Sequence, residues 1–387
     1  MKKILFGIFL IIFFLAVGFF LFKNKVGDIR PAVLPVKPLP TNNTNITPAN
    51  LPLKLPSQYT LGLFAENTGN GRDLEFSPGQ TLLVSITSEG EIKALPDKNQ
   101  DGRADSVKTV LTGLKNPHGI AFYNGKLYVA EETKISRYNW NEQNLEAVFD
   151  KTLFNIPQGG RHFSRSLAFD SKGNLYVTVG STCDVCRENH PWLSAVIVSD
   201  AQGNNPRLFA SGLRNSVFIA VNPETNELWG TEMGRDFLGD NAPPDEINII
   251  KDGENYGWPN CYGDKIPDAN FNQNANCSNT EPPVYRIQAH SAPLGLVFIN
   301  SPQFPADWQG DLLVAYHGSW NRSSPVGYKI VRMNVEGNQV LEEEDFISGF
   351  LEESQVIGRP VDLVFDKKGN LYISDDKSGA VYIVTIK

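Results

Sequence analysis

Along this chain, a short hydrophobic segment ending in an aromatic residue repeatedly precedes a polar turn and an alternating hydrophobic segment. In residues 159–181, the first segment centres on Leu167 and Phe169, the turn contains Gly173, and the second segment runs from Leu175 to Val177. Alternation with a period of two on both sides of a tight turn predicts a pair of antiparallel strands.

The same pattern occurs five more times. The other copies begin at Asp73, Gly119, Ser216, Gly295 and Val361. Most copies are spaced by roughly the 40 to 50 residues of one four-stranded blade, which predicts an all-β fold, a six-bladed β-propeller. Strands over residues 59–66 and 379–386 are expected to pair in one blade and so remove an exposed edge. Residues 236–290, rich in Asn, Asp, Pro and Gly, are expected to form an insertion over one face.

The N-terminal residues carry a different signal. Lys2 and Lys3 precede an apolar run over residues 4–22, which approaches the roughly 20 residues that span a bilayer. We therefore expect residues 1–24 to be an uncleaved membrane anchor. The alternative is a signal peptide that is removed, with Ala16-Val17-Gly18 as its small-residue cleavage site. Either segment would export the rest: a Pro- and Asn-rich linker over 25–57 and the propeller over 58–387.

Charge and cysteine content narrow the possible partners. The 387 residues carry a formal net charge of -8, and without a basic run this argues against a nucleic-acid partner. Four cysteines in an exported chain suggest disulfides between sequence neighbours, Cys183 with Cys186 and Cys261 with Cys277. A four-cysteine zinc site or a redox-active dithiol is the alternative.

One loop has the spacing of a calcium site. In DKNQDGRAD, oxygen ligands stand at positions 1, 3, 5 and 9 of an EF-hand-like loop, with Gly102 at position 6. These residues are Asp97, Asn99, Asp101 and Asp105. Because Lys108 stands where the bidentate Glu of that loop belongs, a simple polar hairpin turn is the alternative.

Polar side chains also recur at the ends of the predicted blades, where a propeller directs them toward its central channel. His162 precedes the first strand of one blade, and its neutral imidazole could accept a proton from a substrate hydroxyl. Arg214 and Asn215 occupy the equivalent place in the next blade, and a buried arginine there needs an anionic partner. His118 is expected to be a hydrogen-bonded structural residue. Further candidates at blade ends are His290, Arg322 and Arg359.

A second group of oxygen-bearing residues follows Arg214. The Gly-rich stretch from Gly234 to Gly263 contains Asp245, Glu246 and Tyr256. Acidic and amide oxygens in such a loop suit calcium, and a solvated loop is the alternative.

Taken together, GGRHFSRSLAFDSKGNLYVTVGSTCDVC, GLRNS, DEINIIKDGENYGWPNCYG and HGSWNR resemble the pyrroloquinoline quinone (PQQ)-dependent sugar dehydrogenases. The resemblance covers residues 60–387 and is closest to the sorbosone dehydrogenase-like branch. It implies a six-bladed propeller with the quinone over the central channel. It also implies that His162 takes the proton from the anomeric hydroxyl of an aldose while hydride passes to the quinone, giving a lactone or acid.

The same resemblance assigns ligand roles. It implies that Arg214, Asn215 and Arg359 bind the cofactor, and that the backbone carbonyls of Gly234 and Arg235 hold a catalytic calcium ion. A second, structural calcium site would involve Asp245, Glu246 and Tyr256. Electrons would pass to a membrane quinone or a small carrier.

The chain departs from the glucose dehydrogenase branch at several of these places. Arg161 replaces an Asp that adjoins the catalytic histidine, and Arg235 replaces a Pro. His290 lies near the position of a cofactor-binding Thr, and Arg322 could substitute for a cofactor-binding Lys. Glucose specificity is therefore not implied. Two other functions remain open: a non-catalytic propeller that binds a glycan or protein, and a calcium-dependent lactone hydrolase. The His- and Arg-rich channel argues against the hydrolase.

Overall fold

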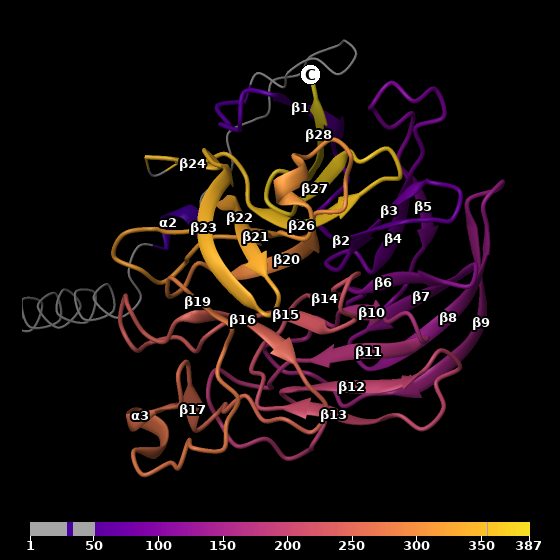
Figure 1. Cartoon of the computed structure of the whole chain (residues 1–387). Coiled ribbons are helices and arrows are strands. Elements are labelled where there is room, and N and C mark those ends of the chain that lie inside the picture. The colour runs from indigo at the N-terminus through magenta and orange to yellow at the C-terminus, as the bar shows by residue number, and fades with distance from the viewer. Residues whose placement is uncertain (1–28, 34–50, 354) are drawn as a thin grey trace, which may run out of the picture.

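The computed structural model describes residues 29–33, 51–353 and 355–387, and nearly all their regular structure is β (Figure 1). The expected membrane anchor and most of the expected linker lie outside these residues. Among the helices that are described, none is long and apolar enough to cross a membrane.

Within the described residues, the strands form six four-stranded antiparallel sheets and two short hairpins. The first sheet contains β2 (Gly71–Phe76), β3 (Leu82–Ile86), β4 (Glu91–Leu95) and β5 (Lys108–Leu111). The second contains β6 (Ile120–Tyr123), β7 (Lys126–Glu131), β8 (Lys134–Asn141) and β9 (Glu146–Asn155). The third contains β10 (Leu167–Phe169), β11 (Asn174–Val179), β12 (Ala195–Asp200) and β13 (Arg207–Ser211).

The remaining sheets follow the same plan. The fourth contains β14 (Ile219–Val221), β15 (Leu228–Glu232), β16 (Asp245–Ile250) and β19 (Tyr285–Ile287). The fifth contains β20 (Pro293–Phe298), β21 (Leu312–Tyr316), β22 (Lys329–Glu336) and β23 (Gln339–Ile347). The sixth contains β26 (Pro360–Phe365), β27 (Leu371–Asp375), β28 (Ala380–Ile386) and β1 (Tyr59–Ala65).

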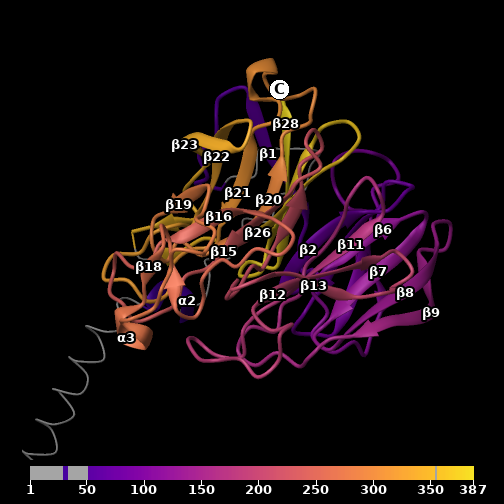
Figure 2. The ribbon, with the colours of Figure 1, turned by 60° about the horizontal axis from the view of Figure 1, so that its bottom comes forward.

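The ring closes where the two ends of the propeller meet. β1 pairs with β28 in antiparallel register, with Tyr59 opposite Ile386 and Leu61 opposite Val384. Around the ring, the innermost strands β2, β6, β10, β14, β20 and β26 each contact their neighbours, β26 and β2 included. The indigo and yellow strands therefore lie side by side in Figures 1 and 2. Both the six-bladed propeller and its mode of closure are confirmed.

The hydrophobic core lies mainly between neighbouring blades. The second strand of a blade is covered on both faces, so β3 (LLVSI) and β21 (LLVAY) are buried throughout. Trp229 of the fourth blade, for example, packs edge-on against Phe298 of the fifth, with ring centroids 5.5 Å apart. Because each blade is wedged between two others, the loops at its ends have fixed positions around the channel.

The expected insertion over residues 236–290 is only partly an insertion, because β16 and β19 within it are regular strands of the fourth blade. The added structure is a hairpin of β17 (Cys261–Tyr262) and β18 (Ile266–Pro267), followed by α3 (Ala269–Asn272). The short elements elsewhere are α2 (Arg30–Val33), η1 (Ala306–Trp308), β24 (Leu351–Glu352) and β25 (Gln355–Val356).

Candidate functional site

Loops from the third, fourth and fifth blades enclose a pocket of about 200 Å³. They precede the innermost strands β10, β14 and β20 or follow the second strands β15 and β21, so all of them lie at the same end of the channel. The pocket is lined by Arg161, His162, Arg214, Asn215, Met233, Gly234, Asp236, Asp245, His290, Ala292, Trp320 and Asn321. Six of the residues singled out in the sequence therefore converge here: His162, Arg214, Asn215, Gly234, Asp245 and His290.

His162 is held through one ring nitrogen. Its Nδ1 lies 2.7 Å from Ser181 Oγ and 3.2 Å from the Ser181 carbonyl oxygen. Because the Ser181 hydroxyl donates its own hydrogen to the Cys183 carbonyl at 2.7 Å, its oxygen can only accept from the imidazole. This network assigns the proton to Nδ1 and leaves the Nε2 lone pair available as a base.

The surroundings also keep this imidazole uncharged. Burial and, after it, the positive charges of Arg214 and Arg161 together lower the pKa of His162 to about 3. The group is therefore a proton acceptor at any pH near neutrality, which is the state that a general base requires.

This state can be tested by nuclear magnetic resonance. A free histidine titrates near a pKa of about 6.5, whereas the His162 imidazole should keep its neutral chemical shifts from pH 8 to pH 5. A titration of the histidine Hε1 and ring ¹⁵N resonances measures this, and a His162→Gln variant assigns the signal. A midpoint for His162 between pH 6 and 7 would contradict the buried, cation-flanked geometry.

Arg214 is buried and surrounded by acceptors. Its Nη2 lies 2.7 Å from Asp184 Oδ1, Nε donates to the Asp184 carbonyl at 2.9 Å, and Nη1 donates to the Met233 carbonyl at 3.2 Å. A second carboxylate oxygen, Asp236 Oδ2, is 3.8 Å away. These contacts compensate the buried charge and fix the guanidinium at the pocket wall.

Two neighbours of these residues also face the pocket. Among the described residues, the side-chain nitrogen of Asn215 has a single hydrogen-bond partner, the weak acceptor Met233 Sδ, at 3.6 Å. Arg161 uses Nη2 to bind Asp236 Oδ2 at 3.2 Å, and its Nε and Nη1 donate to no described residue. Its guanidinium carbon lies 5.9 Å from the centre of the Trp320 ring. Both side chains therefore retain hydrogen-bonding capacity toward a ligand.

The other three candidate cofactor ligands donate hydrogen bonds to backbone carbonyls of the protein. His290 lines the pocket, and its Nε2 donates to the Gly239 carbonyl at 2.8 Å. Arg322 donates to the carbonyls of Asp240 and Ala289, and Arg359 donates to the carbonyl of His317 at 2.9 Å. His290 and Arg322 thus fix the loop between Gly234 and Asp245, and neither Arg322 nor Arg359 belongs to the pocket lining. Their role as cofactor ligands stays a prediction.

The proposed calcium dipeptide lies at the edge of the same pocket. The amide of Gly234 donates to Asp245 Oδ1 at 2.9 Å, and the other oxygen of Asp245 accepts from the Ala292 amide at 2.8 Å. Burial raises the pKa of Asp245 to about 7. The Arg235 side chain turns away and pairs with Asp268 at 2.9 Å. Neither the Gly234 nor the Arg235 carbonyl accepts a hydrogen bond from a described residue, so both oxygens remain available to a hard cation.

The carboxylates of the other predicted calcium sites bind protein donors. Glu246 accepts from the Gly263 amide at 2.8 Å and from Asn248 at 3.0 Å, and Tyr256 donates to the Ile249 carbonyl at 2.5 Å. In the Asp97–Asp105 loop, Asp97 accepts from the amides of Asp101 and Gly102, Asn99 and Asp101 each accept from a nearby backbone amide, and Asp105 accepts from the Lys98 amide. In the described part of the chain, the one tight cluster of three His, Cys, Asp or Glu residues is Cys183, Cys186 and Glu188. Both structural calcium sites stay predictions.

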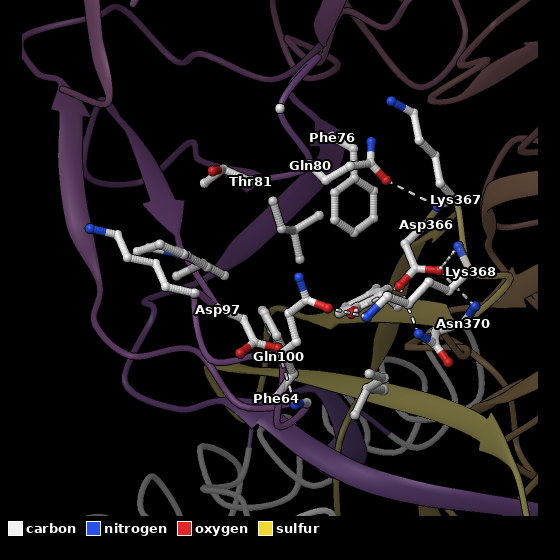
Figure 3. Close-up of a pocket in the computed structure, with 18 of the residues that line it drawn as sticks. Phe64, Phe76, Gln80, Thr81, Asp97, Gln100, Asp366, Lys367, Lys368 and Asn370 are labelled. Atoms are coloured by element: carbon white, nitrogen blue, oxygen red, sulfur yellow. Dashed lines mark hydrogen bonds between the residues drawn. The ribbon is translucent and has the colours of Figure 1, made fainter. Parts of the chain in front are cut away.

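The Asp97 loop belongs to a different pocket, of about 530 Å³, shown in Figure 3. Turns between β2 and β3, β4 and β5, β8 and β9, and β26 and β27 form it, together with residues of β1 and β28. These turns follow the first or the third strand of a blade, whereas the His162 loops precede the first strand or follow the second, so this pocket lies at the opposite end of the propeller from His162. Gln100 accepts from Lys368 Nζ at 2.6 Å and Gln80 accepts from the Lys367 amide at 3.0 Å, so its polar groups largely bind one another.

Two smaller expectations are confirmed. The disulfides are Cys183–Cys186 and Cys261–Cys277. His118 is buried, with Nδ1 3.1 Å from the Arg165 carbonyl and its ring against Phe218. Sequence reasoning missed Ser181, Asp184, Asp236, Trp320 and Asn321, although Asp184 stands between two cysteines and Trp320 and Asn321 belong to the HGSWNR motif.

These observations define a class of protein: a six-bladed propeller with a polar, cation-lined pocket at one end of its channel. The family described as TrAA12-like matches residues 53–387, and the chain belongs to this family. The resemblance found in the sequence is thereby confirmed.

Several relatives were found by sequence. The chain is 32% identical over 357 residues to an uncharacterized protein of Borreliella burgdorferi, covering 86% of this chain and 90% of that protein. It is 31% identical over 212 residues to the aldose sugar dehydrogenase YliI of Escherichia coli, covering 48% of this chain and half of that protein. It is 26% identical to the pyrroloquinoline quinone-dependent pyranose dehydrogenase of Coprinopsis cinerea, covering 78% of this chain and half of that protein.

Among solved structures, the iodide structure of the Trichoderma reesei family AA12 enzyme superimposes with a TM-score of 0.76. It is 22% identical and covers 90% of this chain and all of that one. The holo form of the PQQ domain of the Coprinopsis cinerea enzyme gives a TM-score of 0.73 at 20% identity, covering 87% of this chain and 97% of that domain. At these identities the likeness shows the fold.

Proposed function

We propose that this protein is a PQQ-dependent oxidoreductase that oxidises an aldose or a related sugar aldehyde to the lactone or acid. The observation that carries the proposal is the neutral His162 imidazole, which presents Nε2 in a pocket shared with Arg214 and Asn215. In this mechanism Nε2 takes the proton from the hydroxyl on the carbon that is oxidised. Ser181 keeps the proton of the free imidazole on Nδ1, so the basic nitrogen faces the substrate.

The pocket lining suits a planar, polycarboxylate quinone. Arg161 and Arg214 supply guanidinium groups for carboxylates and for negative charge on the reduced ring, Asn215 supplies an amide, and Trp320 supplies a flat apolar surface. When bound there, the quinone would supply the hydride acceptor. The chain itself contributes the base, the orienting hydrogen bonds and partial exclusion of water.

The alternatives have less support. A lactone hydrolase that relies on calcium would need several side-chain carboxylates directed at one ion, and the carboxylates of this pocket, Asp236 and Asp245, bind Asn321, Arg161 and backbone amides. A glycan-binding propeller without catalysis remains an outcome of the test below.

The test uses the full chain with its disulfides intact, incubated with calcium and PQQ and then given a panel of aldoses while the quinone absorbance is followed. The proposal expects loss of the oxidised quinone spectrum with at least one sugar. Cofactor binding without any reduction would limit the proposal to the binding site. If neither cofactor binding nor oxidation is found, the dehydrogenase proposal is wrong.

A calcium requirement is a separate prediction. If the Gly234 and Arg235 carbonyls hold the catalytic ion, treatment with EDTA should abolish quinone reduction, and added calcium should restore it. An Asp101→Asn variant tests the distant Asp97 loop: it should lower the number of bound calcium ions without changing kcat. Atomic absorption of the dialysed protein and the sugar assay measure the two effects. Activity that is insensitive to EDTA would rule out the catalytic ion.

For its cellular setting, we propose that residues 4–22 anchor the protein on the outer side of a membrane. From there the site would deliver electrons to a quinone in the membrane or to a small carrier. Two disulfides within the propeller suit an oxidising, exported environment.

A further inference from the structure

The loop that follows the second strand of the third blade, residues 181–188, contains the Cys183–Cys186 disulfide. We name it the disulfide loop. Glu188 holds the two ends of this loop together: its carboxylate accepts from the Thr182 amide at 2.7 Å and from the Thr182 hydroxyl at 2.9 Å. Both cysteines of this loop are partly exposed to solvent.

One residue of the disulfide loop fixes the proposed base. The Cys183 carbonyl accepts the hydrogen of the Ser181 hydroxyl at 2.7 Å, and this hydroxyl accepts from His162 Nδ1. The proton position on His162 therefore depends on where the Cys183 carbonyl points. If this carbonyl turned away, the hydroxyl could donate to Nδ1 instead and favour the tautomer with its proton on Nε2.

Another residue of the loop fixes the buried arginine. Asp184 lies within the ring that the disulfide closes, and it binds Arg214 through both its carbonyl and its carboxylate. The same carboxylate oxygen accepts from the Asp236 amide at 2.8 Å. One four-residue ring thus binds Arg214 directly and positions His162 through the Ser181 hydroxyl.

We propose that the Cys183–Cys186 disulfide is a positioning element of this active site, and that its reduction switches the protein to a less active form. The disulfide confines the Cys183 carbonyl and Asp184 to the positions that orient His162 and Arg214, because a closed ring this small has few conformations. For its effect on catalysis, the inference rests on the proposed dehydrogenase function.

The chemistry of the switch is thiol–disulfide exchange. A dithiol reductant attacks one sulfur of Cys183–Cys186, forms a mixed disulfide and then closes its own ring. Two cysteine thiols are released, and two electrons and two protons pass from the reductant to the protein. Cys261 and Cys277 are 5% and 4% exposed, so the same reductant should reach them much more slowly.

Titratable and charged groups around His162 could also respond to an opened loop. Arg161, Arg214, Asp236, Asp245 and His290 share its pocket, Arg165 donates to its backbone carbonyl, and Asp184 lies behind Arg214. Because all these groups would contribute to a pH profile, the inference is tested by the tautomer of His162 at a fixed pH of 7.5.

The experiment compares two paired variants of the full chain, Cys183→Ser/Cys186→Ser and, as the matched control, Cys261→Ser/Cys277→Ser. Loss of the hydrogen bonds that orient metal ligands typically costs about 10–100-fold in activity, and the bonds that orient His162 and Arg214 would have a comparable positioning role. We expect the first pair to lower kcat by about that factor with a smaller change in KM, and the control pair to keep kcat within about twofold. Equal kcat in the first pair and the unmodified protein would overturn the inference.

A second measurement is independent of catalysis. In cofactor-free protein, the ring ¹⁵N shifts of His162 should show a proton fixed on Nδ1, and reduction of Cys183–Cys186 by a limiting dithiol should give a mixture of tautomers. Alkylation and mass spectrometry identify which cysteines were reduced, and reoxidation should restore the spectrum. An unchanged spectrum after reduction would overturn the inference, even if no sugar is oxidised and the proposed function itself fails. The same reduction replaces the first variant if that variant does not fold.

Discussion

Replacing His162 with alanine is expected to lower kcat/KM for sugar oxidation by about 10²–10⁴-fold, the usual contribution of a general base. Ser181 binds Nδ1 of this imidazole, which leaves the Nε2 lone pair available within the pocket. Cofactor affinity should change little, because the proposed carboxylate partners are Arg161 and Arg214. The sugar assay at saturating quinone, together with a cofactor titration, separates the two effects.

His190→Ala is the matched control. His190 is exposed and accepts from the Trp192 amide at 3.1 Å, away from the pocket lining. We expect its kcat/KM to stay within about twofold of the unmodified protein. If His162→Ala retained full activity, another group would have to take the proton, and the proposed mechanism would be wrong.

Replacing Arg214 with alanine is expected to destabilise the protein by about 3–5 kcal/mol, since breaking a buried ion pair leaves its partner charge without compensation. The partners left behind would be Asp184 and Asp236, whose oxygens lie 2.7 Å and 3.8 Å from the guanidinium. Cofactor binding should fail in the same variant. Denaturant-induced unfolding and a quinone titration measure the two losses.

Arg207→Ala provides the comparison for this prediction. Arg207 makes a two-pronged pair with Asp252 at 2.6 Å, but both side chains are 54% exposed. Exposed pairs are worth about 0–1 kcal/mol, so this variant should remain nearly as stable as the unmodified protein. Equal losses for the two variants would show that burial of the Arg214 pair has no special energetic role.

The architecture could be predicted from the sequence because it depends on local signals. Alternation with a period of two around Gly-containing turns is encoded within each repeat, as between Leu167 and Val177. Six such repeats bury their faces by packing side by side in a ring. The extra strands at the two ends of the propeller, β1 and β28, satisfy their backbone hydrogen bonds by pairing with each other. The disulfide pairing could also be predicted, because each cysteine pairs with its nearest cysteine in the sequence.

The site could be predicted only in part. His162, Arg214 and Asn215 stand directly before innermost strands, so the blade pattern alone places them at the channel. Arg322 and Arg359 also stand at blade ends, but their long side chains reach backbone carbonyls of neighbouring loops instead of the pocket. A long arginine side chain can adopt several rotamers, and its final direction depends on which backbone carbonyls lie within reach. Those carbonyls belong to residues distant in the sequence.

The tertiary structure alone decided the contacts around the reacting groups. Ser181 orients His162 because the end of β11 lies beside the loop before β10, and Asp184 pairs with Arg214 because the disulfide loop folds over the fourth blade. No repeat pattern encodes these pairings. The sequence by itself determined the blades and the placement of a histidine, an arginine and an asparagine at their ends. Which acceptors surround them depends on packing between blades, because loops without regular periodicity take their positions from the rigid strands that carry them.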